Sequence, residues 1–313
     1  MSSPAIDLAA CRKIGVGLKR PEDVVISRDG AIWASDQASA CARIEPDGLV
    51  HVGKVAGAPN GITLDLAGRL LIANFGGPED GYGPLQRLDP TTGNVELLCD
   101  ELQGRKMWGA NYPLIDTRGR IWCSHSTWGP LDAAYQGQHD GLVFRVDPDS
   151  TVTVLAEGIK FANGLAMDFD ERNLFVCETA GCDVIRYPIA ADGSLGTPTR
   201  YGPSLGLSNL EVQDRRPLSL DLRSQLGATD GCAFDQDGNL WVTLVMANKI
   251  VAITPNGEVV TVLSDPAGSL MRNPTNVSFG GSDLRDVYVG SVTSNYVLHA
   301  RSPVPGMPLT HQR

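Results

Sequence analysis

The chain has 313 residues, of which 35 are glycine and 20 are proline, and its formal net charge is −10. Each interior glycine or proline costs a helix about 1 to 3 kcal/mol, so this content excludes a helical bundle. Hydrophobic residues make up 42% of the chain, which is enough for a sizeable core and excludes a disordered protein. The negative charge makes nucleic acid and anionic membranes poor partners, and it suits a bound cation.

Signals for membrane insertion or export are missing from the sequence. No stretch approaches the roughly 18 apolar residues of a membrane span, and residues 1–15 lack the basic start and apolar block of a signal peptide. Seven cysteines, an odd number without CxxC spacing, predict reduced thiols. We therefore expect a cytoplasmic protein in which Cys123, Cys177 and Cys232 are buried structural thiols.

A strand–turn–strand pattern recurs six times along the chain. Each copy opens on a polar side chain, continues with a short apolar strand and a turn, and ends in a strand that carries a large apolar residue. The openers are Glu22, Asn60, Asn111, Asn163, Asp230 and Asn276. A second hairpin follows most copies, such as ARIEPDGLVHV after the first, so the unit has four strands. Propeller blades repeat at about 40 to 50 residues, which fits this unit.

The pattern predicts an all-β protein: a single domain over residues 1–313 that forms a six-bladed β-propeller of four-stranded antiparallel blades. The last copy lacks a fourth strand, and an unpartnered strand near residues 12–19 precedes the first opener. We expect this N-terminal strand to complete the last blade and close the ring without an exposed edge. A β-sandwich is the alternative, but it does not explain six equivalent openers. Three long connections are predicted functional loops, with a short helix near 220–226 in the last: residues 75–86, 124–140 and 200–229.

The six openers predict a ring of side chains at one end of the channel, because the first strand of each blade lines it. The ring has two carboxylates, four amides and no basic residue. Hard cations such as Ca2+ take oxygen ligands, whereas Zn2+ prefers histidine or cysteine. Asn-Gly and Asp-Gly are also ordinary turn pairs, so each opener alone has a structural alternative. Two carboxylates and several amides at one register favour a cation site.

Four segments, PEDVVISRDGAIW, GANYPLIDTRGRIW, FANGLAMD and ATDGCAFDQDGNLWV, make the chain resemble the senescence marker protein (regucalcin)/gluconolactonase family, which is related to diisopropylfluorophosphatase. The likeness runs from about residue 20 to residue 300. It implies hydrolysis of a lactone or a related ester. It also implies one divalent metal ion, Ca2+ first, with Zn2+, Mn2+, Mg2+ and Fe2+ as alternatives. The implied ligands are Glu22, Asn163 and Asp230, with Asn111 as a fourth ligand or a substrate-orienting amide.

The chain departs from the sugar-lactonase pattern beside Asn111. Where those members carry Arg-x-Asn-Asp, this sequence reads Gly109-Ala110-Asn111-Tyr112, so the arginine that contacts sugar hydroxyls is absent. The apolar neighbourhood predicts a substrate less polar than an aldonolactone. No second metal is expected, because Ser278 stands where some phosphofluoridase-like members carry a histidine. The predicted substrate contacts are Asn60, Trp108, Tyr112, Trp128, Thr179 and Asn276.

Three residues are assigned to the chemistry. Asp230 is the candidate base or nucleophile, and Asn111 orients the substrate and stabilises the developing oxyanion. His125, at the metal end of its hairpin, is a proton shuttle or a substrate contact, with a loop histidine bonded to backbone as the alternative. Residues 202–206 match G-x-S-x-G, but nearby prolines and the lack of a following helix argue against a nucleophile elbow. Phosphotriester hydrolysis, dehydration or isomerisation at the same site stays open, as does a non-catalytic calcium-binding propeller.

Overall fold

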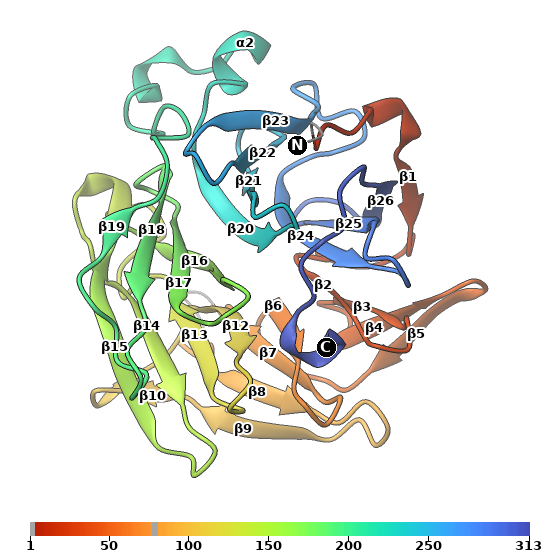
Figure 1. Ribbon diagram of the computed structural model, residues 1–313, viewed down its shortest axis with the longest axis vertical. Helices are drawn as coiled ribbons and strands as arrows, with labels where there is room; N and C mark the ends of the chain where they lie inside the picture. Colours follow the sequence, from red (N-terminus) through yellow and green to blue (C-terminus); the bar gives the residue numbers. More distant parts are fainter. Residues whose placement is uncertain (1–3, 77–80) are drawn as a thin grey trace.

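The computed structural model describes residues 4–76 and 81–313, which form six four-stranded antiparallel sheets arranged in a ring (Figure 1). The protein is a six-bladed β-propeller, as the repeat predicts. In blades one to five the strands follow chain order from the inside outward. No helix of the described residues is long and apolar enough to cross a membrane.

The strands of the first three blades follow the predicted hairpins. Blade one holds β2 (Val24–Ile26), β3 (Ile32–Ser35), β4 (Cys41–Glu45) and β5 (Gly48–Val52). Blade two holds β6 (Pro59–Leu64), β7 (Leu70–Asn74), β8 (Leu85–Leu88) and β9 (Val95–Cys99). Blade three holds β12 (Ala110–Ile115), β13 (Ile121–His125), β14 (Gly141–Val146) and β15 (Val152–Ile159), after the small hairpin of β10 (Glu101–Leu102) and β11 (Arg105–Lys106).

The other three blades have the same order, except at the closure. Blade four holds β16 (Ala162–Met167), β17 (Asn173–Glu178), β18 (Asp183–Pro188) and β19 (Thr199–Arg200). Blade five holds β20 (Thr229–Phe234), β21 (Leu240–Leu244), β22 (Lys249–Ile253) and β23 (Val259–Ser264). Blade six holds β24 (Pro274–Gly280), β25 (Asp286–Ser291), β26 (Val297–Arg301) and β1 (Arg12–Ile14). The short helices are η1 (Leu8–Ala10), η2 (Ala133–Gln136), η3 (Gln213–Arg215), α2 (Leu220–Arg223) and η4 (Thr310–Gln312).

The N-terminal strand closes the ring, which confirms the prediction. β1 pairs antiparallel with β26 in the register Arg12↔His299 to Ile14↔Val297. The Arg12 Nε also donates to Nδ1 of His299 at 3.0 Å. The helix expected near residues 220–226 is observed as α2. The first and last parts of the chain are therefore joined within one blade.

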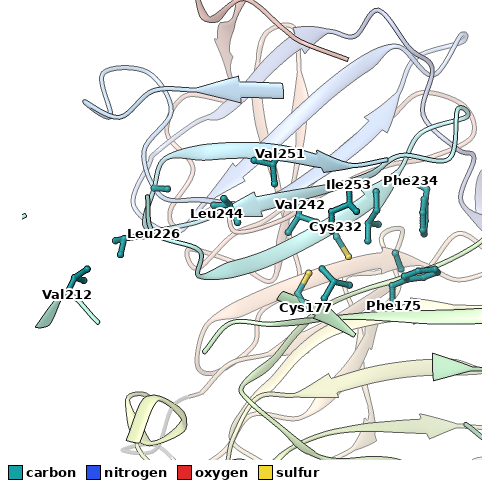
Figure 2. Packing of buried hydrophobic residues seen from close by; sticks show 14 residues of the cluster. Phe175, Cys177, Val212, Leu226, Cys232, Phe234, Val242, Leu244, Val251 and Ile253 are labelled. Carbon is teal, nitrogen blue, oxygen red and sulfur yellow. The ribbon is translucent and has the colours of Figure 1, made fainter. Parts of the chain in front are cut away.

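Apolar side chains pack mainly between neighbouring blades. In the cluster between blades four and five, Cys177 on β17 and Cys232 on β20 face each other among apolar residues (Figure 2). Both thiols are buried, and burial raises the pKa of Cys177 well above its usual range. All seven cysteines are free, and Cys123, Cys177 and Cys232 are buried as predicted.

An aspartate closes the inner hairpin of four blades, five residues after the opener. Its carboxylate accepts the backbone N–H of the residue four positions along, at 2.7 to 2.9 Å. Such side-chain bonds satisfy turn amides that the strand ladder leaves unpaired. The four residues are Asp65, Asp116, Asp168 and Asp235.

The segment after β26, residues 302–313, crosses the end of the channel opposite the openers and ends beside β2 (Figure 1). The Met307 N–H donates to the Phe234 carbonyl of blade five at 2.9 Å, and the Thr310 hydroxyl donates to the Ile115 carbonyl of blade three at 3.0 Å. Gln312 Nε2 donates to carbonyl oxygens of blades one and six. We call residues 302–313 the C-terminal tail.

Candidate active site

The opener of blade two lies in a β-bulge at the start of its innermost strand. Pro59 pairs with Asn74 and Ile62 with Ile72, so two residues, Asn60 and Gly61, face one on β7. A bulge turns its side chains out of the regular ladder. The same shift of register occurs at Asn111, Asn163 and Asp230. These four side chains therefore occupy one equivalent position, which we call the ring position.

Blade one contributes Glu22 to this position. The Asp23 N–H donates to the Ser35 hydroxyl at 3.0 Å, just as the Tyr112 N–H donates to the Ser124 hydroxyl at 3.0 Å in blade three. Asp23 is thus equivalent to Tyr112, and Glu22 to Asn111. The sequence prediction of the ring position is confirmed for five of the six blades.

In blade six the predicted opener, Asn276, does not occupy the ring position. Its register runs from Pro274↔Ser291 to Val277↔Val289, so its bulge contains Thr275 and Asn276. The ring position belongs to Thr275, and Asn276 lies one residue further along. β24 has seven residues, one more than β6, β12, β16 and β20, because its hairpin contains the extra pair Gly280↔Asp286, and this moves the ring position one residue earlier than the repeat predicted.

The residues that follow the ring position form a second layer. Asp23, Tyr112 and Asn276 are buried there, and Asn276 Nδ2 donates to the Asp23 carboxylate. The other three blades supply glycine, because a Cβ on Gly61 would lie 2.6 Å from Tyr112 Cδ2 and one on Gly231 2.6 Å from the Thr275 carbonyl oxygen. Beyond Tyr112 lies a cavity of about 40 Å³ that the C-terminal tail also lines. The second layer is the floor of the ring.

Hydrogen bonds fix the orientation of the ring amides. Asn60 Nδ2 donates to Asn111 Oδ1 at 3.2 Å, and Asn111 Nδ2 donates to the Ser126 hydroxyl at 2.9 Å. Asn163 Nδ2 donates to the Thr179 hydroxyl at 3.1 Å, which brings together two residues that the sequence assigned to the site. The amides are held before any ligand arrives, as a preorganised site requires.

The two ring carboxylates are buried close to each other. Glu22 is 3% exposed and Asp230 8%. Burial raises the pKa of both well above the usual range, and the charge of Asp230 raises that of Glu22 further. Glu22 Oε2 is buried and has no hydrogen-bond partner among the described residues. A buried carboxylate oxygen without a donor is costly, by about 1–3 kcal/mol or more, unless a cation offsets it.

This donor set fits a hard divalent cation. Carboxylate oxygens of Glu22 and Asp230 and amide oxygens of Asn111 and Asn163 are the ligand types that Ca2+ takes. Residues 4–76 and 81–313 contain no group of three or more histidine, cysteine or acidic side chains placed to hold an ion. An ion here would therefore depend on the amides as well as on the two carboxylates.

The sequence reasoning missed a basic residue beside the ring. Arg20 Nη2 donates to Asn60 Oδ1 at 2.8 Å, and its Nη1 donates to the Pro59 carbonyl at 3.1 Å. Glu22 and Asp230 act electrostatically on its guanidinium, against the lowering of its pKa by burial. Arg20 lies two residues before Glu22, outside the repeat that identified the ring residues.

His125 lies in an aromatic cluster next to the ring. Its ring stacks on Trp128 with centroids 4.1 Å apart, and Trp108 lies edge-on at 6.2 Å. Its Nε2 accepts the Gly109 N–H at 3.3 Å, while its buried Nδ1 has no partner among the described residues. Burial lowers the pKa of His125 to about 3. The imidazole is uncharged near neutral pH, which favours a contact residue over a proton shuttle.

A tyrosine that the sequence reasoning also missed brings two long loops to the site. Tyr135 of η2 lies near Asp230, whose charge adds to burial in raising the pKa of the Tyr135 phenol. Asn209, in the connection that runs from residue 200 to 229, lies close to this phenol and partly offsets the rise in its pKa. The long loops after β13 and β19 therefore meet beside the ring, as their length predicts.

Comparisons with known proteins identify the family of this chain. The family described as the SMP-30/gluconolactonase/LRE-like region matches residues 43–293. A 6-deoxy-6-sulfogluconolactonase from Pseudomonas putida is 27% identical over 266 residues, which cover 84% of this chain and 79% of that protein. A gluconolactonase from Zymomonas mobilis is 23% identical, and the match covers 68% of this chain and 56% of the relative.

Solved structures show the same fold. A gluconolactonase from Xanthomonas campestris superimposes with a TM-score of 0.70 at 18% identity, covering 97% of this chain and 96% of the other. The calcium-binding protein regucalcin from Agrobacterium tumefaciens gives a TM-score of 0.69 at 15% identity, with 95% of each chain covered. With the matched region spanning most of the sequence, the chain belongs to the SMP-30/gluconolactonase/LRE-like family.

Proposed function

We propose that this protein is a divalent-metal-dependent hydrolase that opens a lactone or a related ester. The observation that carries the proposal is the pair of buried carboxylates, Glu22 and Asp230, at one ring position with a Glu22 oxygen that no described residue satisfies. The relatives named as lactonases support the reaction class. Glu22, Asn163 and Asp230 would hold the ion, with Asn111 as the fourth ligand or as an orienting amide. Ca2+ is the ion that we expect.

When bound, the ion supplies Lewis-acid polarisation of the substrate carbonyl. Asp230 takes a proton from the water whose oxygen bonds to the carbonyl carbon. The ring C–O bond then breaks, and the proton passes from Asp230 to the leaving alkoxide. Asn111 retains one amide hydrogen beyond its bond to Ser126, and this hydrogen orients the substrate. The products are a carboxylic acid and a hydroxyl on one open chain.

We further propose a substrate body less polar than an aldonolactone. Phe75 contacts Trp108 edge-on at 5.7 Å between centroids and lies 6.4 Å from Phe161. Together with Trp108 and Trp128 around His125, these side chains form an aromatic cluster to which blades two and three and the residue before β16 contribute. Free cysteines support our proposal that the protein works in the reducing cytoplasm on a small molecule.

The test is a metal analysis followed by a chelator-reversible assay on lactones, with Asp230→Asn as the variant. We expect metal-dependent hydrolysis that Asp230→Asn lowers by about 10²-fold or more. Asp237→Asn, an exposed neutralisation in the same blade, is the matched control. Full lactone hydrolysis after chelation would contradict the proposal. Parallel assays of a phosphotriester and of dehydration, and a measurement of calcium binding without turnover, separate the alternative functions.

A further inference from the structure

The backbone holds Arg20 in an unusual conformation. Its φ is 53°, in the left-handed region that costs a residue with a Cβ about 1–2 kcal/mol. The Glu22 N–H donates to the Arg20 carbonyl at 2.8 Å, and the Gln37 N–H to the Lys19 carbonyl at 2.9 Å. The Lys19 N–H donates in turn to Asp36 Oδ1 at 2.9 Å. These bonds pin the segment before β2 and aim the Arg20 side chain over blade two.

Hydrogen bonds hold the Arg20 side chain in place, but they do not neutralise its positive charge. Nη1 donates one hydrogen to the Pro59 carbonyl, and Nη2 donates one to Asn60 Oδ1. Three of the five guanidinium hydrogens remain for a ligand. Both acceptors are uncharged, and Arg20 forms no ion pair with a described carboxylate. Its nearest negative charges are Glu22 and Asp230, which are the proposed ligands of the ion.

A positive charge beside a cation site weakens ion binding, because like charges repel strongly where water is excluded. Once an ion neutralises Glu22 and Asp230, the guanidinium has no anionic partner in the described part of the ring. A strained and pinned arginine in this position points to a ligand that supplies one. Carboxylates, sulfonates and phosphates match the planar fork of N–H donors.

We infer that Arg20 is a specificity-determining residue that binds an oxyanion carried by the lactone. This inference rests on the proposed function. The favoured substrate has a hydrophobic body, which faces Phe75 and Trp108, and one acid group, which reaches Arg20. The sequence lacks arginine at Gly109, and Arg20 supplies a guanidinium from the segment before blade one instead.

The test uses two lactones that differ only in charge: the γ-lactone of α-hydroxyglutarate, which carries a carboxylate, and its neutral carboxamide. We expect wild-type kcat/KM to favour the carboxylate by at least about ten-fold. Arg20→Met is expected to remove most of this preference, mainly through KM, and Arg20→Lys to restore part of it. Lys19→Met removes the adjacent exposed charge and is the matched control, with the preference retained.

A binding measurement separates this inference from the reaction itself. Calorimetry of α-hydroxyglutarate and of its mono-amide, the two ring-opened products, needs no turnover. Both contain the carboxylate formed by ring opening, and only the first contains the second acid group. Weaker binding of α-hydroxyglutarate alone to Arg20→Met supports the inference, even if neither lactone is hydrolysed and the proposed function fails. An equal loss for both molecules, or no wild-type preference, would overturn it.

Discussion

The indole Nε1 of Trp241 donates to Oδ2 of Asp235 at 2.9 Å. In blade three Trp122 donates to Asp116 in the same way, also at 2.9 Å. Each aspartate accepts the turn amide four residues along as well. One buried carboxylate thus joins the turn of the inner hairpin to its second strand.

Asp235→Ala is expected to lower the free energy of unfolding by about 2–4 kcal/mol. The change leaves the Trp241 indole and the Asn239 amide without their acceptor in a buried place, and each loss costs about 1–3 kcal/mol. Urea unfolding followed by tryptophan fluorescence measures it. The exposed Asp237→Ala should change stability by less than about 0.5 kcal/mol. Equal effects of the two substitutions would show that the buried carboxylate has no special role.

Glu22→Gln is expected to separate stability from ion binding. The substitution removes a buried charge whose Oε2 has no described partner, so the metal-free protein should become more stable by about 1 kcal/mol or more. Divalent ions should bind at least about 100-fold more weakly, because one of two carboxylate ligands is lost. Unfolding with a chelator and calorimetry with Ca2+ measure the two effects. A destabilised variant that binds the ion normally would contradict this account of the ring.

Gly231→Ala is expected to displace the ring residue Asp230 by crowding the second layer, which forms the floor of the ring. The new Cβ would lie 2.6 Å from the Thr275 carbonyl oxygen, and a backbone atom at that distance has to move. Because Gly231 follows Asp230 directly, we expect activity to fall by about ten-fold or more, through the misplaced carboxylate. Gly196→Ala is the control, since its Cβ would meet nothing closer than 3.5 Å. Normal kcat/KM in Gly231→Ala would mean that the floor does not position Asp230.

The C-terminal tail predicts a loss of stability in acid. His311 Nε2 bonds to the Ile26 carbonyl at 3.0 Å, and burial lowers the His311 pKa from 6.5 to about 4. The folded state therefore prefers the neutral imidazole. The contribution of this preference to the free energy of unfolding is complete above pH 6.5 and is lost as the pH falls toward 4.

In His311→Gln the slope of the unfolding free energy against pH should fall in this window by up to about 1.4 kcal/mol per pH unit, the contribution of one proton. Chemical unfolding at several pH values measures the slope. Thr310→Ser, which keeps the neighbouring hydroxyl, should leave it as in wild type. An unchanged slope in His311→Gln would show that this histidine does not titrate on unfolding.

Six openers were enough to predict the blades, because the same strand–turn–strand pattern recurs in chain order. The closing strand was predictable too, since the N-terminal part of the chain had an unpaired strand and the last blade lacked its fourth strand. Blade six was misaligned by one residue at Asn276, because β24 is one residue longer than the equivalent strands and carries the extra pair Gly280↔Asp286. The alignment depended on a constant strand length, whereas register depends on backbone hydrogen bonds.

The ring residues could be predicted because they occupy one repeated position. Arg20 could not be found in this way, since it precedes the repeat and reaches the ring through a left-handed backbone conformation. The low pKa of His125 follows from packing against Trp108 and Trp128, which come from different loops. Contacts of this kind depend on tertiary structure that a periodic pattern does not contain.

The C-terminal tail and the Tyr112 floor have a consequence for how molecules move. Both line the cavity below the ring, and the tail crosses from blade to blade on that side, so both lie on the side of the channel opposite the ring. In the proposed reaction, substrate would therefore enter and product leave from the ring side. Under the proposed function, we therefore expect the open-chain acid to compete with substrate for the ring, so that its departure precedes each new turnover.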